Sequence, residues 1–549
     1  LGDVYKRQVM DRAQRALAPA IVAPKQWNGG AAAGRPYRRE LVLMNDHFHP
    51  LQGELRWSLV DERGEVRVSD RIPFSLDAVE HRDVLLKFPM PFIDRPKTWM
   101  LRLEMVDAQG RKLYQDEHEL GVLPPVDLAT LPPVVLWPEA GTAANHPVAL
   151  RCRVDPRLPG DPGTVVVVPR GAKLTASQWR ELESLVAGGG RALVLADRDL
   201  PDDFGGTTIR SSEKPAAIAH LRCPEHPIVN DLPPAALRYW VGAGGEFFNP
   251  PAGRMAPEIV VAQNALRRPR SGTFLTILDA GLGGLLVGET DPGLTQSPMF
   301  EVRHGRGRAL FCSLLLFEGL ATGEPAAEWL LARIINYLND PAQWIGGEPK
   351  PVVAVGVDLT RLGVQTTALW NEAGLLVINA ADGAGRQLLS ERAEACKQFA
   401  QQGGTLLVHN LSAEQVEGVA RLVGVPLRSK TYPAAEAPTR LDWISADPAT
   451  RGLSHFDVNW MDTELLYRVK ARQPILAVGV WAQDSAARNL TRQGALVTIP
   501  LGRGRVIIDQ VLWDSPEFAS DYIRRRAEGY IAQLLANCDV KMTTKKPTQ

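Results

Sequence analysis

The sequence predicts a multidomain protein in which a β-sandwich is followed by two α/β domains. The main observation is an internal repeat, because residues 303–340 and 500–538 share one pattern. Each copy has a Gly-Arg-Gly-Arg turn, a short apolar run that barely alternates, and then a helix. Such a run is typical of a strand covered on both faces, so two copies predict two α/β domains in tandem. The turns are residues 305–308 and 502–505, and the apolar runs are residues 309–317 and 506–513.

Length and composition limit the class of protein. A chain of 549 residues is too long for one hydrophobic core, and three or four domains are expected. The 62 basic and 62 acidic residues cancel, which argues against a protein that binds nucleic acid through charge. No apolar run is long enough to cross a membrane, so we expect neither a nucleic acid nor a membrane as partner. Five widely spaced cysteines predict buried free thiols, and no cofactor or metal is expected.

The first residues do not look like the start of a natural protein. The chain begins at Leu1 without a methionine, and residues 1–8 resemble the translated adaptor sequence found at the ends of metagenomic assemblies. Residues 9–18 have helical spacing, with Met10, Ala13 and Leu17 on one side, and stop before Pro19. We interpret residues 9–36 as the last helix and exit loop of a missing domain, which leaves the compartment unknown.

Residues 37–123 are predicted to form a β domain. Several segments alternate between apolar and polar residues, as in Leu55, Trp57 and Leu59, and Asn45-Asp46 is one of the turn signals between them. Regular short strands over fewer than ninety residues indicate a sandwich of immunoglobulin type, without the cysteine pattern of antibody domains. The predicted strands are residues 39–45, 53–60, 66–69, 83–88, 99–106 and 113–122.

Two α/β segments follow a proline-rich linker at residues 124–133. In the first, residues 134–345, a strand at 164–168, a helix at 175–187 with Thr175 as N-cap and a strand at 191–196 predict a parallel sheet. The second, residues 346–541, repeats this order, and residues 542–549 are expected to be a tail. Its strands are predicted at residues 352–357, 375–379 and 405–409, and its helix at residues 388–401. Residues 226–240 and 451–460 occupy equivalent places in the two segments.

The turns after the buried strands carry no catalytic nucleophile. Many α/β enzymes place a Ser or Cys on a sharp turn directly after a strand. Here Pro169 follows Val168 and Asn379 follows Ile378, while Cys312 is expected inside a buried strand as an inert thiol. Phosphate loops, metal-ligand spacing and a marked carboxylate pair are all missing from the sequence. We therefore predict no catalytic, cofactor-binding or metal-binding residue.

Two weaker signals each have a structural alternative. Arg306 and Arg503 in the glycine-rich turns offer an anion site, but solvated arginines in tight turns are the preferred interpretation. Aromatic residues beside the sheet loops are candidates for contact with a glycan, because sugars stack on exposed ring faces. Packing beneath a loop is the favoured alternative for these aromatic side chains. The glycan candidates are Trp240, Phe247, Phe248 and Trp460.

Two stretches of the sandwich, RRELVLMNDHFHPLQGELRWSLVDERGEV (residues 38–66) and WMLRLEMVDAQGRKL (residues 99–113), carry a resemblance. They are similar to the immunoglobulin-like domain that follows the catalytic barrel in glycoside hydrolase family 2 and related β-galactosidase-like enzymes. The shared features are the Asn45-Asp46 turn, the strand with Trp57 and two Asp…Gly turns. Residues 9–24 resemble the last helix of such a barrel and its exit.

The α/β segments resemble the class I glutamine-amidotransferase-like domains, flavodoxin-like in fold, at the C-termini of large β-galactosidases. There such domains act in oligomerisation and have lost their nucleophile. The matching pieces are residues 164–196, 226–240 and 305–340, with their equivalents in the second copy. The family's catalytic glutamates lie in the barrel, so none can be assigned to a residue of this chain.

The resemblance implies the non-catalytic C-terminal part of a large glycoside hydrolase that cleaves O-glycosyl bonds, acting on β-galactosides or related β-glycosides. The sandwich would support the barrel, and the α/β domains would make contacts in a homo-oligomer or shape the cleft for a carbohydrate substrate. One alternative is a stand-alone carbohydrate-binding or assembly protein. Another is an active amidotransferase-like or hydrolase domain, against which the turns without a nucleophile argue.

Overall fold

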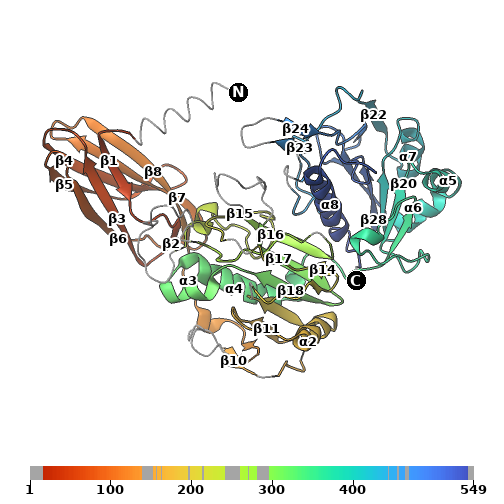
Figure 1. Ribbon diagram of the computed structural model, residues 1–549, viewed down its shortest axis with the longest axis horizontal. Helices are drawn as coiled ribbons and strands as arrows, with labels where there is room; N and C mark the ends of the chain where they lie inside the picture. Colours follow the sequence, from red (N-terminus) through yellow and green to blue (C-terminus); the bar gives the residue numbers. More distant parts are fainter. Residues whose placement is uncertain are drawn as a thin grey trace.

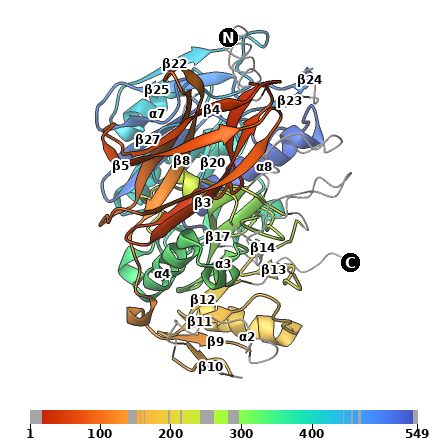
Figure 2. The same cartoon turned by 90° about the vertical axis from the view of Figure 1, so that its left-hand side faces the viewer.

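The protein is multidomain and rich in β-structure, with seven α-helices in the part that the computed structural model describes. We name its three parts the sandwich (residues 19–123), domain 1 (residues 134–345) and domain 2 (residues 346–541) (Figure 1). Domain 1 contacts both of the others, and the sandwich lies in front of domain 2 in Figure 2. None of the helices in the described residues is long and apolar enough to span a membrane. The described residues are 17–138, 152–155, 157–161, 163–195, 198–212, 215–240, 260–269, 271–280, 296–442, 444–453, 457–463 and 469–541.

Two sheets enclose the core of the sandwich, one in the order β1-β3-β6 and the other in the order β2-β8-β7-β4-β5. Alternate residues of β4, including Leu55, Trp57 and Leu59, point into a core that both sheets share. All six expected strands are present, and most of their ends lie within three residues of the prediction, but β5 runs seven residues beyond its predicted end. The strands are β1 (Ala20–Pro24), β2 (Gly30–Ala32), β3 (Pro36–Asn45), β4 (Leu51–Val60), β5 (Val66–Leu76), β6 (His81–Pro89), β7 (Lys97–Asp107) and β8 (Lys112–Leu123).

The sandwich begins earlier in the chain than the sequence predicts. Residues 20–32 are not an exit loop, because β1 pairs with β3 in one sheet and β2 pairs with β8 in the other. Both strands are short, and their partners lie far along the chain, so local periodicity gives little sign of them. Residues 9–16 of the expected N-terminal helix lie outside the described residues.

Domain 1 is an open sheet between helices, in the order β10-β9-β11-β12-β18-β17-β16-β15. The first five strands in this order are parallel, and the last three are antiparallel. Val165 and Val167 face the core under α3 and α4, whereas Val166 and Val168 face the core under α2. Burial on both faces explains why this run does not alternate, and Thr175 caps α2 as expected. The elements are β9 (Val134–Leu136), β10 (Cys152–Val154), β11 (Val165–Val168), α2 (Ala176–Ala187), β12 (Arg191–Val194), β15 (Ala219–Leu221), η2 (Pro234–Leu237), β16 (Phe274–Ala280), β17 (Gln296–His304), β18 (Gly307–Cys312), α3 (Leu316–Thr322) and α4 (Pro325–Asn339).

Domain 2 repeats this plan in the order β19-β20-β21-β28-β27-β26, with the first four strands parallel. Helices α5, α6 and α7 cover one face, and α8 covers the other. The helix expected at residues 388–401 is instead two helices that meet at Arg392. The elements are β19 (Val352–Val355), β20 (Leu375–Asn379), α5 (Gly383–Glu391), α6 (Ala393–Gln401), β21 (Thr405–His409), α7 (Val416–Val423), β22 (Leu427–Thr431), β25 (Val478–Ala482), β26 (Arg488–Asn489), β27 (Leu496–Leu501), β28 (Gly504–Asp509) and α8 (Asp521–Ala536).

The apolar run at residues 309–317 is not one strand. In the structure β18 ends at Cys312, and α3 begins at Leu316. A short apolar run suits a buried strand and a buried helix equally well, so the sequence pattern could not separate the two.

Each Gly-Arg-Gly-Arg turn joins two antiparallel strands and holds a helix against them. Gly305 and Gly502 have positive φ angles of 55° and 61°, which suit glycine at a tight turn. Arg306 donates to the carbonyl of Gly188 at the end of α2, at 2.9 Å. Arg503 makes the equivalent bond to Gln402 at the end of α6, at 3.0 Å. These arginines therefore satisfy helix carbonyls, which favours the structural interpretation over an anion site.

The second glycine of each turn lets the strand pass against the same helix end. A Cβ atom on Gly307 would lie 2.2 Å from the carbonyl oxygens of Val186 and Gly190. A Cβ atom on Gly504 would lie 2.1 Å from the carbonyl oxygen of Gly404. A side chain at either position would therefore collide with backbone, and only glycine fits here.

The second arginine of each turn reaches the layer on the other face of its sheet. Arg308 donates to the carbonyl of Ile345, beyond α4, at 2.9 Å. Arg505 donates to the carbonyl of Asn537, at the end of α8, at 3.0 Å. The two arginines of each turn thus bind backbone carbonyls in the layers on both faces of the sheet.

The joint between the sandwich and domain 1 combines close packing with charge pairs. Gly121 of β8 sits so close to Ala236 of η2 that an added Cβ would lie 2.8 Å from the alanine Cβ. Arg35 pairs with Glu328 of α4 at 2.9 Å. Glu324, the N-cap of α4, is 3% exposed beside Gly30, and this burial raises its pKa to about 7.

The joint between domains 1 and 2 is built from ion pairs, of which those of Asp457 are buried and that of Asp539 is partly exposed. Nη2 of Arg222 lies 3.0 Å from Oδ2 of Asp457, and Arg268 binds the same carboxylate from a second side. Arg303 of β17 binds Asp539 just after α8. Removing one member of a buried pair costs about 3–5 kcal/mol, because the other charge is then left without compensation. These pairs therefore fix domain 2 against domain 1.

We predict that Gly504→Ala lowers the free energy of unfolding of domain 2 by about 1–3 kcal/mol, because the new methyl group collides with the end of α6. Gly418→Ala in α7 is the matched control. Nothing lies within 4 Å of a Cβ at this helix position, so the change should raise stability by about 0.5–1 kcal/mol. Urea unfolding measures both variants. Equal stabilities for the two variants would contradict the close approach.

Candidate functional site

Polar side chains gather at the carboxyl ends of the parallel strands of domain 2. Asn379, His409 and Asp509 are the last residues of β20, β21 and β28, and the strand pairing places them in one row. Open α/β sheets bind ligands in the crevice beyond this edge. The row is therefore the first place to look for chemistry in the described residues.

His409 is enclosed between two carboxylates. Its Nε2 lies 2.9 Å from Oδ1 of Asp514, and its Nδ1 lies 3.2 Å from the backbone oxygen and 3.5 Å from Oδ2 of Asp509. Burial by itself would lower the pKa of His409, but the hydrogen bonds and charges of the two aspartates raise it to about 9. The imidazole is therefore a cation at neutral pH, with both nitrogens occupied, and it is not available as a general base.

Both aspartates are occupied by other donors as well. Asp509 is fully buried and accepts hydrogen bonds from Trp513 Nε1 at 2.6 Å and from Tyr530 Oη at 2.8 Å. Asp514 accepts from Asn379 Nδ2 at 2.9 Å through the oxygen that His409 does not use. Burial would raise the pKa of Asp514, but the bond from His409 outweighs it, and the pKa is lowered. The cluster is a closed network in which each charged group has fixed partners.

The turn that follows β21 has an unusual backbone conformation of the kind found at catalytic nucleophiles, but its residue is Asn410. Asn410 has φ of 58°, and its N–H donates to the backbone oxygen of Asp509 at 2.9 Å. A residue other than glycine in this region is uncommon, although asparagine tolerates it better than most. Catalytic serines and cysteines in α/β enzymes occupy sharp turns of this kind. Here the side chain is a carboxamide, which is a poor nucleophile.

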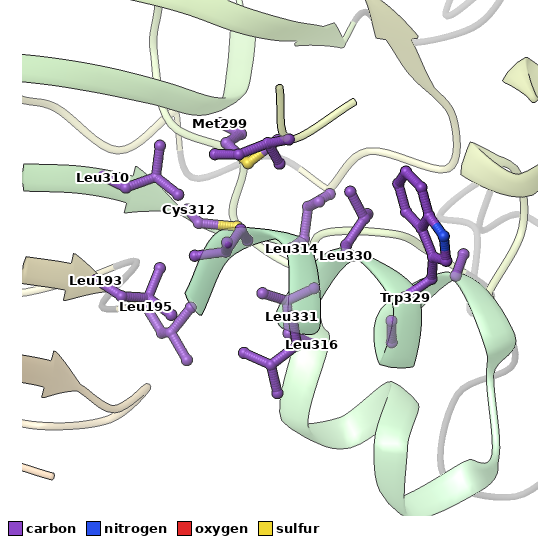
Figure 3. Close-up of a cluster of buried hydrophobic side chains, with 14 of the residues drawn as sticks. Leu193, Leu195, Met299, Leu310, Cys312, Leu314, Leu316, Trp329, Leu330 and Leu331 are labelled. Atoms are coloured by element: carbon purple, nitrogen blue, oxygen red, sulfur yellow. The ribbon is translucent and has the colours of Figure 1, made fainter. Parts of the chain in front are cut away.

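The same edge of domain 1 carries no ionisable row. The pairing of β11, β12 and β18 puts Pro169, Leu195 and Cys312 at the register positions of Asn379, His409 and Asp509. Figure 3 shows Leu195 and Cys312 among leucine side chains of the core. Burial raises the pKa of Cys312 to about 12, so the thiol is inert, as expected.

The aromatic candidates for glycan contact are not on the surface where the structure describes them. Trp240 is 1% exposed and donates from Nε1 to the carbonyl of Ala236 at 2.8 Å. Trp460 is fully buried and packs edge-on against Phe518. Neither indole presents a ring face to solvent. Both therefore agree with the alternative interpretation, in which these aromatic side chains pack beneath a loop. Phe247 and Phe248 lie outside the described residues.

The described residues also offer neither a metal site nor an exposed thiol. Within the described residues, no group of three or more His, Cys, Asp or Glu side chains could hold a metal ion. The four cysteines whose side chains are described, Cys223, Cys312, Cys396 and Cys538, are buried free thiols. The predictions from sequence missed the row of Asn379, His409 and Asp509. Its signal is that three neighbouring strands each end on a polar residue, but this signal requires knowing that β28 lies beside β21.

Comparisons with known proteins give only weak likenesses. No family model matches the chain, and no curated protein matches it. Among solved structures, a family 123 glycoside hydrolase from Clostridium perfringens matches 22% of this chain and 30% of its own, with 12% identity and a TM-score of 0.17. A β-glucuronidase of glycoside hydrolase family 2 matches 19% of this chain and 11% of its own, with 12% identity and a TM-score of 0.15.

Proteins that are not glycoside hydrolases match the chain equally weakly. A sporulation control protein from Bacillus subtilis matches 20% of this chain and 50% of its own, with 12% identity and a TM-score of 0.16. The chain thus spans half or less of each of these proteins. TM-scores this low carry no argument about fold or function.

We predict that domain 2 loses stability as the pH rises from 6.5 to 9.5. The folded-state pKa of His409 is raised from 6.5 to about 9, so its stabilising contribution is complete below pH 6.5 and disappears as the pH passes 9. The loss should be on the order of 2–3 kcal/mol. Hydrogen exchange of the β21 and β28 peptides in a urea series measures it.

His409→Gln should remove this part of the pH dependence and lower stability at pH 7. His81→Gln, at an exposed histidine of the sandwich, is the control and should change neither. A wild-type pH dependence that survives in His409→Gln would show that His409 is not the titrating group.

Proposed function

We propose that this chain is a non-catalytic supporting region of a large glycoside hydrolase of the β-galactosidase type, which hydrolyses O-glycosyl bonds. The sandwich would act as the immunoglobulin-like domain beside the catalytic barrel. Domains 1 and 2 would be amidotransferase-like domains that have lost their chemistry and that serve in subunit contacts or in shaping the substrate cleft.

One observation carries this proposal. The strand-end edge, where α/β enzymes keep their reactive groups, has Asn410 at the strained turn and His409 bound on both nitrogens. The equivalent edge of domain 1 ends in Pro169, Leu195 and Cys312. A domain with this architecture, and with no free nucleophile or base at its described strand ends, is suited to support rather than to catalysis.

The strand order supports the amidotransferase-like, flavodoxin-like assignment. Taken in chain order, the parallel strands β9, β10, β11, β12 and β18 of domain 1 lie in the order 2-1-3-4-5. In domain 2 the place of β10 is taken by a single parallel bridge between Val352 and Thr366. Ion pairs and close-packed glycines at the two joints also favour a support role, because they hold the three parts in fixed positions.

A stand-alone carbohydrate-binding or assembly protein is the second candidate. The one observation that favours it is a hollow of about 480 Å³ on the outer face of the sandwich, floored by Ser58 and Ser69 and walled by Arg56, Arg71 and Arg102. Arginine and serine side chains can hydrogen-bond sugar hydroxyls. Arg56 and Arg71 are already paired with Glu54, however, and Trp57, the aromatic residue that lines the hollow, is 5% exposed and packs into the core, so we prefer the support role.

We predict that the purified chain does not hydrolyse p-nitrophenyl β-galactoside or other aryl β-glycosides above background. The reason is that the described strand ends offer no free acid and base pair of the kind that glycosidases need. The second arm of the test is to sequence the source DNA upstream of Val9, where the proposal expects an open reading frame that encodes a (β/α)₈ barrel.

Turnover by the purified chain that is abolished in Asp514→Asn would contradict the proposal. Asp484→Asn, at an exposed turn, is the matched control for this variant. A start codon and ribosome site beside Met10 would favour the stand-alone protein instead.

A further inference from the structure

The sandwich has a long strand at the end of one sheet. Strand β6 pairs with β3 and is the last strand in the order β1-β3-β6. Its outer side chains are exposed, with Leu85 at 46% and the Asp83 side chain at 67%. An edge strand of this kind offers unpaired backbone groups to another strand.

The hydrogen bonds at the ends of the β3–β6 ladder show which residues face the open edge. Asn45 N donates to Glu80 O at 2.9 Å, and Met90 N donates to Arg35 O at 3.0 Å. In an antiparallel ladder the hydrogen-bonded residues alternate, so every second residue between Glu80 and Met90 turns its backbone toward β3. The residues in between turn their N–H and C=O groups toward the open edge. Those residues include Asp83, Leu85 and Lys87.

These three residues are complementary to themselves. In antiparallel pairing with an identical strand, centred on Leu85, Leu85 lies opposite Leu85 of the copy and Asp83 lies opposite Lys87 of the copy. The same two-fold axis repeats the Asp83–Lys87 pair on the other side. Pairing centred on Val84 or Leu86 would not set these opposite charges face to face.

We propose that two copies of this chain associate through β6, so that the sheets β1-β3-β6 of the copies join into one sheet across a two-fold axis. The inference builds on the proposed function, of which subunit contacts are one part, and it identifies the partner as a second copy. Three paired positions give up to six backbone hydrogen bonds, two ion pairs and a leucine contact. Since this interface is small, association should depend on protein concentration.

The charges around the edge are compatible with this pairing. Asp83 binds Lys25 of the same chain, and a second lysine from the copy would place the carboxylate between two cations. Arg38 lies opposite Lys87 on β3 and adds positive charge where Asp83 of the copy would arrive. Charged side chains on an edge strand commonly prevent pairing with unrelated strands. Here their order prevents unrelated pairing and still permits pairing of two identical strands.

Strand β5, at one end of the second sheet of the sandwich, is less suited to pairing with its own copy. Strand β5 pairs with β4 and ends its sheet. Pairing of two β5 strands about Ser69 would place Arg67 opposite Arg71 of the copy, and Pro73 has no N–H to donate. In this register like charges face each other on β5, whereas opposite charges face each other on β6.

The test is the mass of the full chain in solution, measured by light scattering after size-exclusion chromatography at 5–200 μM. We expect the wild-type mass to approach twice the monomer mass with rising concentration, and K87D and D83K each to remain monomeric. The double variant D83K/K87D restores opposite charges across the axis and should dimerise again. R63E, at an exposed turn of the sandwich, is the control and should behave as wild type.

Leu85→Cys gives an independent readout. Two cysteines opposite each other across the axis would lie within disulfide distance, so mild oxidation should yield a covalent dimer that K87D prevents. A wild type that stays monomeric at 200 μM, or a dimer that K87D leaves intact, would overturn the proposal. Both readouts are independent of glycoside hydrolysis, so they fail or succeed separately from the proposed function.

Discussion

The architecture of both α/β domains depends on one close approach between a strand and the end of a helix. At Gly307 and Gly504 the backbone runs so near the last carbonyls of α2 and α6 that a side chain has no room. The flanking arginines then bind carbonyls on both faces of the sheet. Each residue of the repeated turn thus has one structural role. In order, the four residues form the tight turn, cap the helix, allow the strand to pass the helix end, and bind the layer on the opposite face of the sheet. The layers of each domain follow from this contact.

The two α/β domains share this frame and differ at their strand ends. Domain 1 fills the positions with Pro169, Leu195 and Cys312, which join its apolar core, whereas domain 2 holds a buried imidazolium between two aspartates. Because the fold forms with either set, it does not require the polar row. Burying these charges is costly unless every partner is in place, and in domain 2 the partners are in place. The described strand ends of domain 2 therefore carry residue types that are common in active sites, but the hydrogen bonds and ion pairs within the network leave none of these side chains free to react.

Much of the fold could be predicted from local pattern. The six strands of the sandwich, the Thr175 cap and the repeated turn were each visible, because alternation, capping residues and glycine turns act over a few residues. The short strands β1 and β2 and the division of residues 309–317 were not, since these depend on distant pairing. The polar row at Asn379, His409 and Asp509 escaped for the same reason. Its members lie up to 130 residues apart and meet only through strand order. The burial of Trp240 and Trp460 likewise depends on loops that the sequence alone does not place.

The closed network at the strand ends of domain 2 requires His409 to be a cation bound on both nitrogens, and NMR of its imidazole nitrogens can measure this state. In protein labelled with ¹⁵N at histidine and assigned by comparison with His409→Gln, we expect both ring nitrogens of His409 to carry protons at pH 7.5. Their shifts should change only near pH 9. A neutral imidazole that titrates near pH 6.5, with one nitrogen unprotonated at pH 7.5, would rule out the closed network. It would mean that the strand-end row of domain 2 holds an available base.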